Sequence, residues 1–85
     1  ELALRTFPNP ASGRLSVEGA MPQAGPARVT VHDALGRNVA VLHDGPLAAG
    51  LHAFSLDTAE LAPGLYHVRL TTSEGTAMRR VTVVR

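Results

Sequence analysis

One segment near the C-terminal end constrains the fold more than any other. It runs from Pro63 to Leu70, begins with a Pro-Gly pair and continues with apolar side chains at every second residue. Proline presets φ for a tight turn and glycine supplies a positive φ, so the pair marks a corner. The alternation after the corner is the period of a β-strand. Tyr66 follows the corner directly, where a ring can be buried in a two-sheet sandwich and its hydroxyl can hold the preceding connection. We expect this strand to be central, with its neighbours laid against it.

The same alternation recurs along the chain and is interrupted by turn-forming residues at intervals of roughly ten positions, as in an all-β domain. Strands are predicted at residues 2–7, 14–18, 27–32, 37–42, 52–56, 65–70 and 77–84. The inward pairs expected on four of them are Leu15 with Val17, Val29 with Val31, Val39 with Val41, and Val81 with Val83. Met78 has the opposite parity from Val81, so a bulge is expected near Arg79 and Arg80.

Two polar segments predict the turns that join these strands. Between Asp33 and Gly36, the carboxylate can accept hydrogen bonds from downstream amides and the glycine can take the left-handed conformation, which predicts a hairpin. The segment from Asp57 to Glu60 has the spacing of a capping box. It predicts a single helical turn that places Leu61 at the end of the core.

Together these patterns predict an all-β fold, a Greek-key sandwich of about seven antiparallel strands of immunoglobulin or fibronectin III type. The 85 residues suffice for one domain, residues 1–85, and no segment has a helical period. The chain contains no Cys and no Trp, so it is not an antibody-type domain. It begins with Glu rather than Met and has no signal peptide. We therefore expect it to be a piece of a longer protein.

Composition and motifs argue against most kinds of chemistry. The formal net charge of +1 is too weak for a nucleic-acid-binding surface, and no apolar run approaches the roughly 18 residues of a membrane helix. Phosphate-binding loops, nucleophile motifs and cysteine clusters are all missing from the sequence. We expect no catalytic residue, no cofactor and no enzymatic activity. Two of the three aromatic residues are assigned to the core, which argues against a carbohydrate-binding platform without excluding a groove.

Histidines are the only candidate metal ligands. His32 and His67 are predicted to face outward on neighbouring strands, where a cross-strand pair could hold a metal ion. Two solvated residues on a sheet face are the alternative that we prefer, and we predict no metal site. His52 is expected to be half-buried and bonded to a loop carbonyl.

Several short motifs stand in a fixed order along the chain: Phe7-Pro8-Asn9-Pro10, Leu15 to Val17, Val29 to Arg37, Gly64 to Leu70, and a basic, valine-rich end. This order resembles the C-terminal sorting domain, type A, of the type IX (Por) secretion system of Bacteroidota. The related immunoglobulin-like domain of flagellar hook-capping proteins shares the Gly36-Arg37 hairpin and the Gly64-x-Tyr66 strand. The Pro8-Asn9-Pro10 motif and the basic terminal strand favour the sorting domain. Phe replaces the more frequent Tyr at position 7, and Arg replaces the usual terminal Lys.

The resemblance implies a delivery tag rather than a catalyst. A larger exported protein would cross the inner membrane with a signal peptide and pass through the periplasm. An outer-membrane translocon would then recognise its C-terminal domain, and the cargo would reach the cell surface or the medium. A sortase-like peptidase commonly removes such a domain and attaches the cargo to surface lipopolysaccharide. The resemblance thus implies the secretion machinery, the peptidase and an upstream cargo domain as partners, without nucleic acid or membrane insertion.

The final strand is the expected recognition element, because a terminal edge strand can pair with a partner through its main chain. Its residues are Arg79, Arg80, Val81, Thr82, Val83, Val84 and Arg85. The alternative is an ordinary edge strand whose arginines deter aggregation. Pro8-Asn9-Pro10 is expected near the point where the linker enters, with a structural role. Two other functions stay open: an adhesive immunoglobulin-like module that binds carbohydrate or the cell wall as part of an extracellular enzyme, and a structural domain like that of a flagellar cap.

Overall fold

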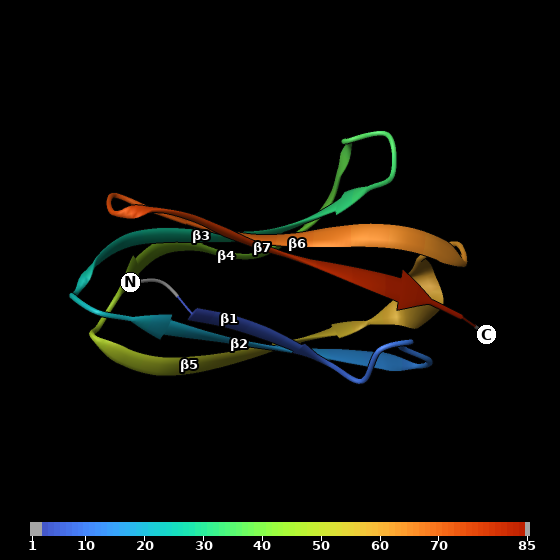
Figure 1. Cartoon of the computed structure of the whole chain (residues 1–85), viewed down its shortest axis with the longest axis horizontal. Coiled ribbons are helices and arrows are strands. Elements are labelled where there is room, and N and C mark those ends of the chain that lie inside the picture. Colours follow the sequence, from blue (N-terminus) through green and yellow to red (C-terminus); the bar gives the residue numbers. More distant parts are fainter. Residues whose placement is uncertain (1–2, 85) are drawn as a thin grey trace.

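This computed structural model describes residues 3–84, which contain seven strands and one short 3-10 helix (Figure 1). The strands are β1 (Ala3–Phe7), β2 (Arg14–Met21), β3 (Gly25–Asp33), β4 (Asn38–Leu47), β5 (Gly50–Asp57), β6 (Gly64–Thr72) and β7 (Gly75–Val83). The helical turn η1 (Thr58–Glu60) lies between β5 and β6. It is capped by Asp57, whose carboxylate accepts the Ala59 amide at 2.9 Å, so the predicted single turn is confirmed.

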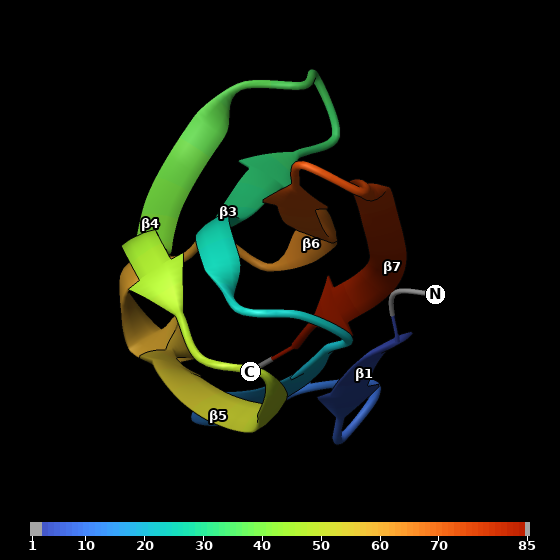
Figure 2. The same cartoon turned by 90° about the vertical axis from the view of Figure 1, so that its left-hand side faces the viewer.

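The strands form two antiparallel sheets that face each other across one interior (Figures 1 and 2). One sheet has the order β1-β2-β5 and the other the order β4-β3-β6-β7. The pairings β2–β5 and β3–β6 join strands that are not consecutive in sequence, as in Greek-key sandwiches. The predicted all-β sandwich is therefore confirmed. β6 has a hydrogen-bonded neighbour on each side, which agrees with its expected central position.

The core is aliphatic and follows the predicted alternation on most strands. Leu15 and Val17 on β2 and Val29 and Val31 on β3 are buried. Other buried side chains of the larger sheet come from β6 and β7: Tyr66, Val68, Leu70, Val81 and Val83. Burial of such side chains is the main term that stabilises the fold. Leu61 is buried directly after η1, where the helical turn was expected to place it.

On β4 the prediction of the inward face is wrong. The side chains of Val39 and Val41 are 40% and 49% exposed. Ala40 and Leu42 pack against the core instead. Ala40 pairs directly with the buried Val31, and two register shifts interrupt the β3–β4 ladder. Because a one-residue shift moves side chains to the opposite face, the valine alternation alone did not define this strand's orientation.

The expected bulge in β7 is also absent from the described strand. The β6–β7 register is continuous from Gly64↔Val83 to Thr72↔Gly75. Met78 keeps the parity of the outward residues and is 45% exposed. Met78 is therefore an apolar residue on the solvent face of an edge strand, and its parity requires no bulge.

Candidate functional site

The predicted recognition strand, β7, forms one edge of the four-stranded sheet. Val81 and Val83 are buried, whereas Arg79, Arg80 and Thr82 are exposed. Val84, directly after the strand, is 37% exposed. The side chains of Val81 and Val83 are therefore not available to a partner. Arg85, the last residue of the predicted set, lies outside the described residues.

The segment Pro8–Ala11, which we call the strap, lies along the C-terminal half of β7. Ala11 forms a parallel bridge with Val83. Its amide donates to the Thr82 carbonyl at 2.8 Å, and its carbonyl accepts the Val84 amide at 2.9 Å. Both proline peptide bonds of the strap are cis. Two elements that the sequence places at opposite ends of the chain are thus neighbours in space.

The side chain of Asn9 extends this pairing by one more position. Its Oδ1 accepts the Thr82 amide at 3.1 Å, and its Nδ2 donates to the Arg80 carbonyl at 3.4 Å. A side-chain carboxamide carries one acceptor and two donors, so it can substitute for a peptide group of a neighbouring strand. The outer main-chain groups of β7 from the Arg80 carbonyl to Val84 are therefore already occupied.

The N-terminal half of the same edge is different. Along an antiparallel strand, every second residue directs both its amide and its carbonyl to the same edge of the strand. Because the main-chain groups of Thr82 face the strap, those of Met78 and Thr76 lie on this outer side too. Within residues 3–84, no main-chain hydrogen bond joins these groups to another segment. We call residues 76–80 the open half-edge. β1 lies close to β7, but it belongs to the other sheet (Figure 2).

Arg79 occupies an unusual place on this half-edge. It pairs with the buried Val68, so its parity directs it inward, yet it is exposed. Its guanidinium Nη1 donates to the Met78 carbonyl at 2.9 Å and so covers an outward acceptor of the open half-edge. Inward-directed charge on an edge strand is a known protection against non-specific strand pairing. Within residues 3–84, neither Arg79 nor Arg80 forms an ion pair.

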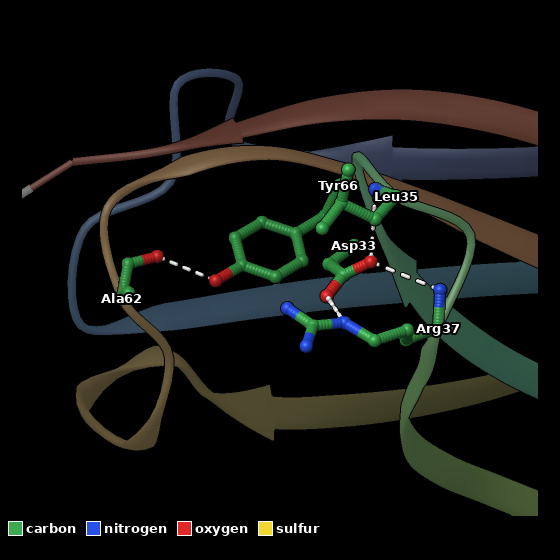
Figure 3. A network of polar contacts seen from close by, with 5 residues as sticks. All are labelled: Asp33, Leu35, Arg37, Ala62 and Tyr66. Atoms are coloured by element: carbon green, nitrogen blue, oxygen red, sulfur yellow. Dashed lines mark hydrogen bonds and ion pairs between the residues drawn. The ribbon is translucent and has the colours of Figure 1, made fainter.

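The connection before β6 is held by Tyr66. Its ring is buried, and its hydroxyl donates a hydrogen bond to the carbonyl of Ala62 (Figure 3). Gly64, between them, has φ 152°, in the region that favours glycine. The expected roles of the corner glycine and the tyrosine are both observed.

The hairpin between β3 and β4 is organised by Asp33. Its Oδ1 accepts the amides of Leu35 and Arg37 at 3.0 and 2.9 Å, and its Oδ2 accepts Nε of Arg37 at 2.8 Å (Figure 3). Gly36 has φ 85°, so the predicted hairpin chemistry is confirmed. The hydrogen bond from the Arg37 amide is the largest cause that lowers the pKa of Asp33 below its ordinary value, and the Arg37 guanidinium acts in the same direction.

The model of a known family matches almost all of this chain. The match covers residues 5–84, and the family is described as the secretion system C-terminal sorting domain. The chain belongs to this family. No curated protein matches it closely enough to be named as a relative. The resemblance seen in the sequence motifs is confirmed, and the chain is a C-terminal sorting signal of type IX secretion.

Several sequence motifs of this sorting domain gather at one end of the sandwich. Asp33 pairs with Tyr66, and Tyr66 pairs in turn with Val81. Gly64 pairs with Val83, beside the strap. The hairpin, the corner, the strap and the end of β7 therefore lie side by side, although each comes from a different part of the sequence.

The matched family is one of sorting signals rather than of catalysts. Within residues 3–84, no three His, Cys, Asp or Glu side chains are grouped as metal ligands. Among those same residues, no helix has the length and apolarity needed to span a membrane. Nε2 of His52 donates a hydrogen bond to the Ala48 carbonyl at 2.7 Å, as expected for a loop contact. Membership of the family implies attachment to a larger cargo and export to the cell surface or the extracellular space.

Proposed function

We propose that residues 1–85 form a single domain that acts as the secretion and surface-anchoring signal of a larger exported protein, and that an outer-membrane translocon recognises it at β7. The observation that carries this proposal is the division of the β7 edge. Its C-terminal half is closed by the strap, whereas its N-terminal half keeps outward main-chain groups beside two arginines without ion pairs among the described residues.

A translocon strand would add to the open half-edge by main-chain hydrogen bonds, as in other cases of strand addition. Arg79 and Arg80 would contribute contacts to acidic groups of the partner, since arginine pairs well with carboxylates. A sortase-like peptidase would then remove the domain after export. The domain itself is the substrate of that peptidase, and it supplies no catalytic group.

A secretion assay tests the signal. The chain is fused behind a signal peptide and a periplasmic reporter in a host that has the type IX system, and the reporter is measured in the periplasm, on the surface and in the medium. We expect the reporter outside the cell, with a mass that shows loss of the tag. A reporter that stays in the periplasm contradicts the signal, and one that is exported with an intact tag contradicts removal by the peptidase.

Arginine variants test the recognition surface. The double variant Arg79→Gln, Arg80→Gln is expected to lower export, because it removes the two cations beside the open half-edge. The matched control is Arg5→Gln, Arg14→Gln, which removes two exposed arginines from β1 and β2 in the other sheet. Equal export by both variants would place recognition elsewhere on the domain.

A further inference from the structure

Two histidines lie directly opposite each other on the two central strands of the larger sheet. His32 on β3 pairs with His67 on β6, and β3 and β6 are adjacent in Figure 1. Directly opposite residues in an antiparallel pair have Cβ atoms about 5 Å apart. Both side chains are half-buried and line the same open hollow of about 220 Å³ on the outer face of the sheet. The placement expected from sequence is therefore observed, and it brings two imidazoles within reach of one ion.

Thr30 fixes the orientation of one of these rings. Its hydroxyl is 2.9 Å from Nε2 of His32, and Thr30 is 3% exposed. A hydroxyl can donate or accept. When the Thr30 hydroxyl accepts the hydrogen of Nε2, the lone pair of Nδ1 is available to bind a metal ion. Metal-bound histidines are commonly held in this way through their second ring nitrogen. No hydrogen bond of the His67 ring is found within residues 3–84.

The rest of the hollow limits which ion would fit. Met78, which carries a thioether, and Asp33, which carries a carboxylate, are among its other lining residues. That carboxylate is already held by Arg37 and by two main-chain amides. The donors that stay available are thus two imidazole nitrogens and one sulfur. Hard cations such as Ca²⁺ and Mg²⁺ require oxygen ligands, whereas imidazole and thioether suit copper.

Two nearby arginines act against any cation. Arg69 lines the hollow, and Arg80 pairs directly with His67 on the neighbouring strand. Their positive charge weakens the binding of divalent ions more than that of a monovalent one. The site therefore favours the metal with the highest intrinsic affinity for nitrogen ligands, which is copper in the order of divalent ions. The same charge also favours Cu(I), for which the thioether of Met78 is a suitable third ligand.

We propose that His32 and His67 form a copper-binding site on the outer face of the larger sheet, with Thr30 as a positioning residue and Met78 as a third ligand for Cu(I). A bound ion would connect the two central strands of the sandwich. Because it would bind the folded state and not the unfolded one, copper would raise the unfolding temperature by mass action. This proposal does not depend on the export of the domain.

The experiment titrates the 85-residue chain with Cu²⁺, Ni²⁺ and Zn²⁺, followed by calorimetry and by thermal unfolding. We expect one Cu²⁺ per chain, bound more tightly than Ni²⁺ or Zn²⁺. His32→Gln and His67→Gln should each weaken Cu²⁺ binding by at least about tenfold. The matched control is His52→Gln, on β5 in the other sheet, which should bind as the unmodified chain does. A loss with His52→Gln equal to that with His67→Gln, or no saturable binding below millimolar Cu²⁺, would overturn the proposal.

Two further variants test the supporting residues. Thr30→Val should lower Cu²⁺ affinity by about tenfold, and Thr30→Ser should restore it, since a second-shell hydroxyl positions its ligand. Met78→Leu should lower Cu(I) affinity, measured by chelator competition under anaerobic reducing conditions, and leave Ni²⁺ affinity unchanged. Unchanged Cu²⁺ binding by Thr30→Val would remove the positioning role. Unchanged Cu(I) binding by Met78→Leu would remove the third ligand.

Discussion

The side chain of Asn9 takes the place of a neighbouring strand beside Thr82. Its Oδ1 lies 3.1 Å from the Thr82 amide nitrogen, although the two residues are separated by 73 positions in sequence. Exposed edge strands offer unpaired main-chain groups to any passing strand. The side chain of Asn9 and the main chain of Ala11 together close half of this edge. The position of a possible partner strand is thereby limited to the other half.

Replacing Asn9 should open the edge locally. In Asn9→Ala the amide of Thr82 loses its acceptor, and the Arg80 carbonyl loses its donor. We expect a loss of about 1 kcal/mol in unfolding free energy, typical of an exposed hydrogen-bonding group. We also expect faster hydrogen exchange at the Thr82 amide. Asn38→Ala is the control, because Asn38 is exposed and forms no side-chain hydrogen bond within residues 3–84. Equal exchange at Thr82 in both variants would contradict the role of Asn9.

Tyr66 allows a test of the corner before β6. Tyr66→Phe keeps the buried ring and removes only the hydroxyl that donates to Ala62. The lost hydrogen bond should lower the unfolding free energy by about 1 kcal/mol, which corresponds to a fall of roughly 4–8 °C in Tm for a domain of this size. Urea unfolding with an unchanged m-value would show that the compactness of the two states is unaffected. A Tm equal to that of the unmodified chain would mean that the corner is held by packing alone.

The lowered pKa of Asp33 predicts a specific dependence on pH. A carboxyl group with a lower pKa in the folded state adds stability above its unfolded pKa, which is about 3.9. This stability is lost as the pH falls through the lower folded value. Asp33→Asn should therefore be less stable than the unmodified chain at neutral pH, with a difference that narrows below about pH 4. Thermal unfolding from pH 2 to pH 7 measures this difference. A difference that stays constant over the range would show that the carboxylate charge contributes nothing.

The fold was largely predictable from local patterns. The alternation on β2, β3, β6 and β7 identified their buried faces, because each strand has one face on the core. The hairpin at Asp33 and the corner at Tyr66 were predictable for the same reason, since their hydrogen bonds join residues at most four positions apart. The family was also recognisable from the order of these local motifs.

The features that were missed depend on contacts between distant segments. The inward face of β4 is set by its pairing with β3, where register shifts leave Val39 and Val41 outside. The contact of the strap with β7 joins residues more than 70 positions apart. The sequence contains both the Pro8-Asn9-Pro10 motif and the final strand, but no periodicity indicates that these segments contact each other. A single Asn between two prolines was the available signal, since such a side chain can replace a peptide group.

The division of the β7 edge leads to a prediction about secretion. Met78 directs its amide away from β6, so proline at this position removes an outward donor and leaves the β6–β7 ladder intact. Proline is tolerated at such positions of edge strands. Met78→Pro should therefore fold, as judged by circular dichroism and cooperative unfolding, yet it should lower export of the reporter fusion strongly. Met78→Leu, which keeps the amide, should be exported normally. Normal export of a folded Met78→Pro fusion would mean that no partner strand adds at the open half-edge, and recognition would then depend on side chains.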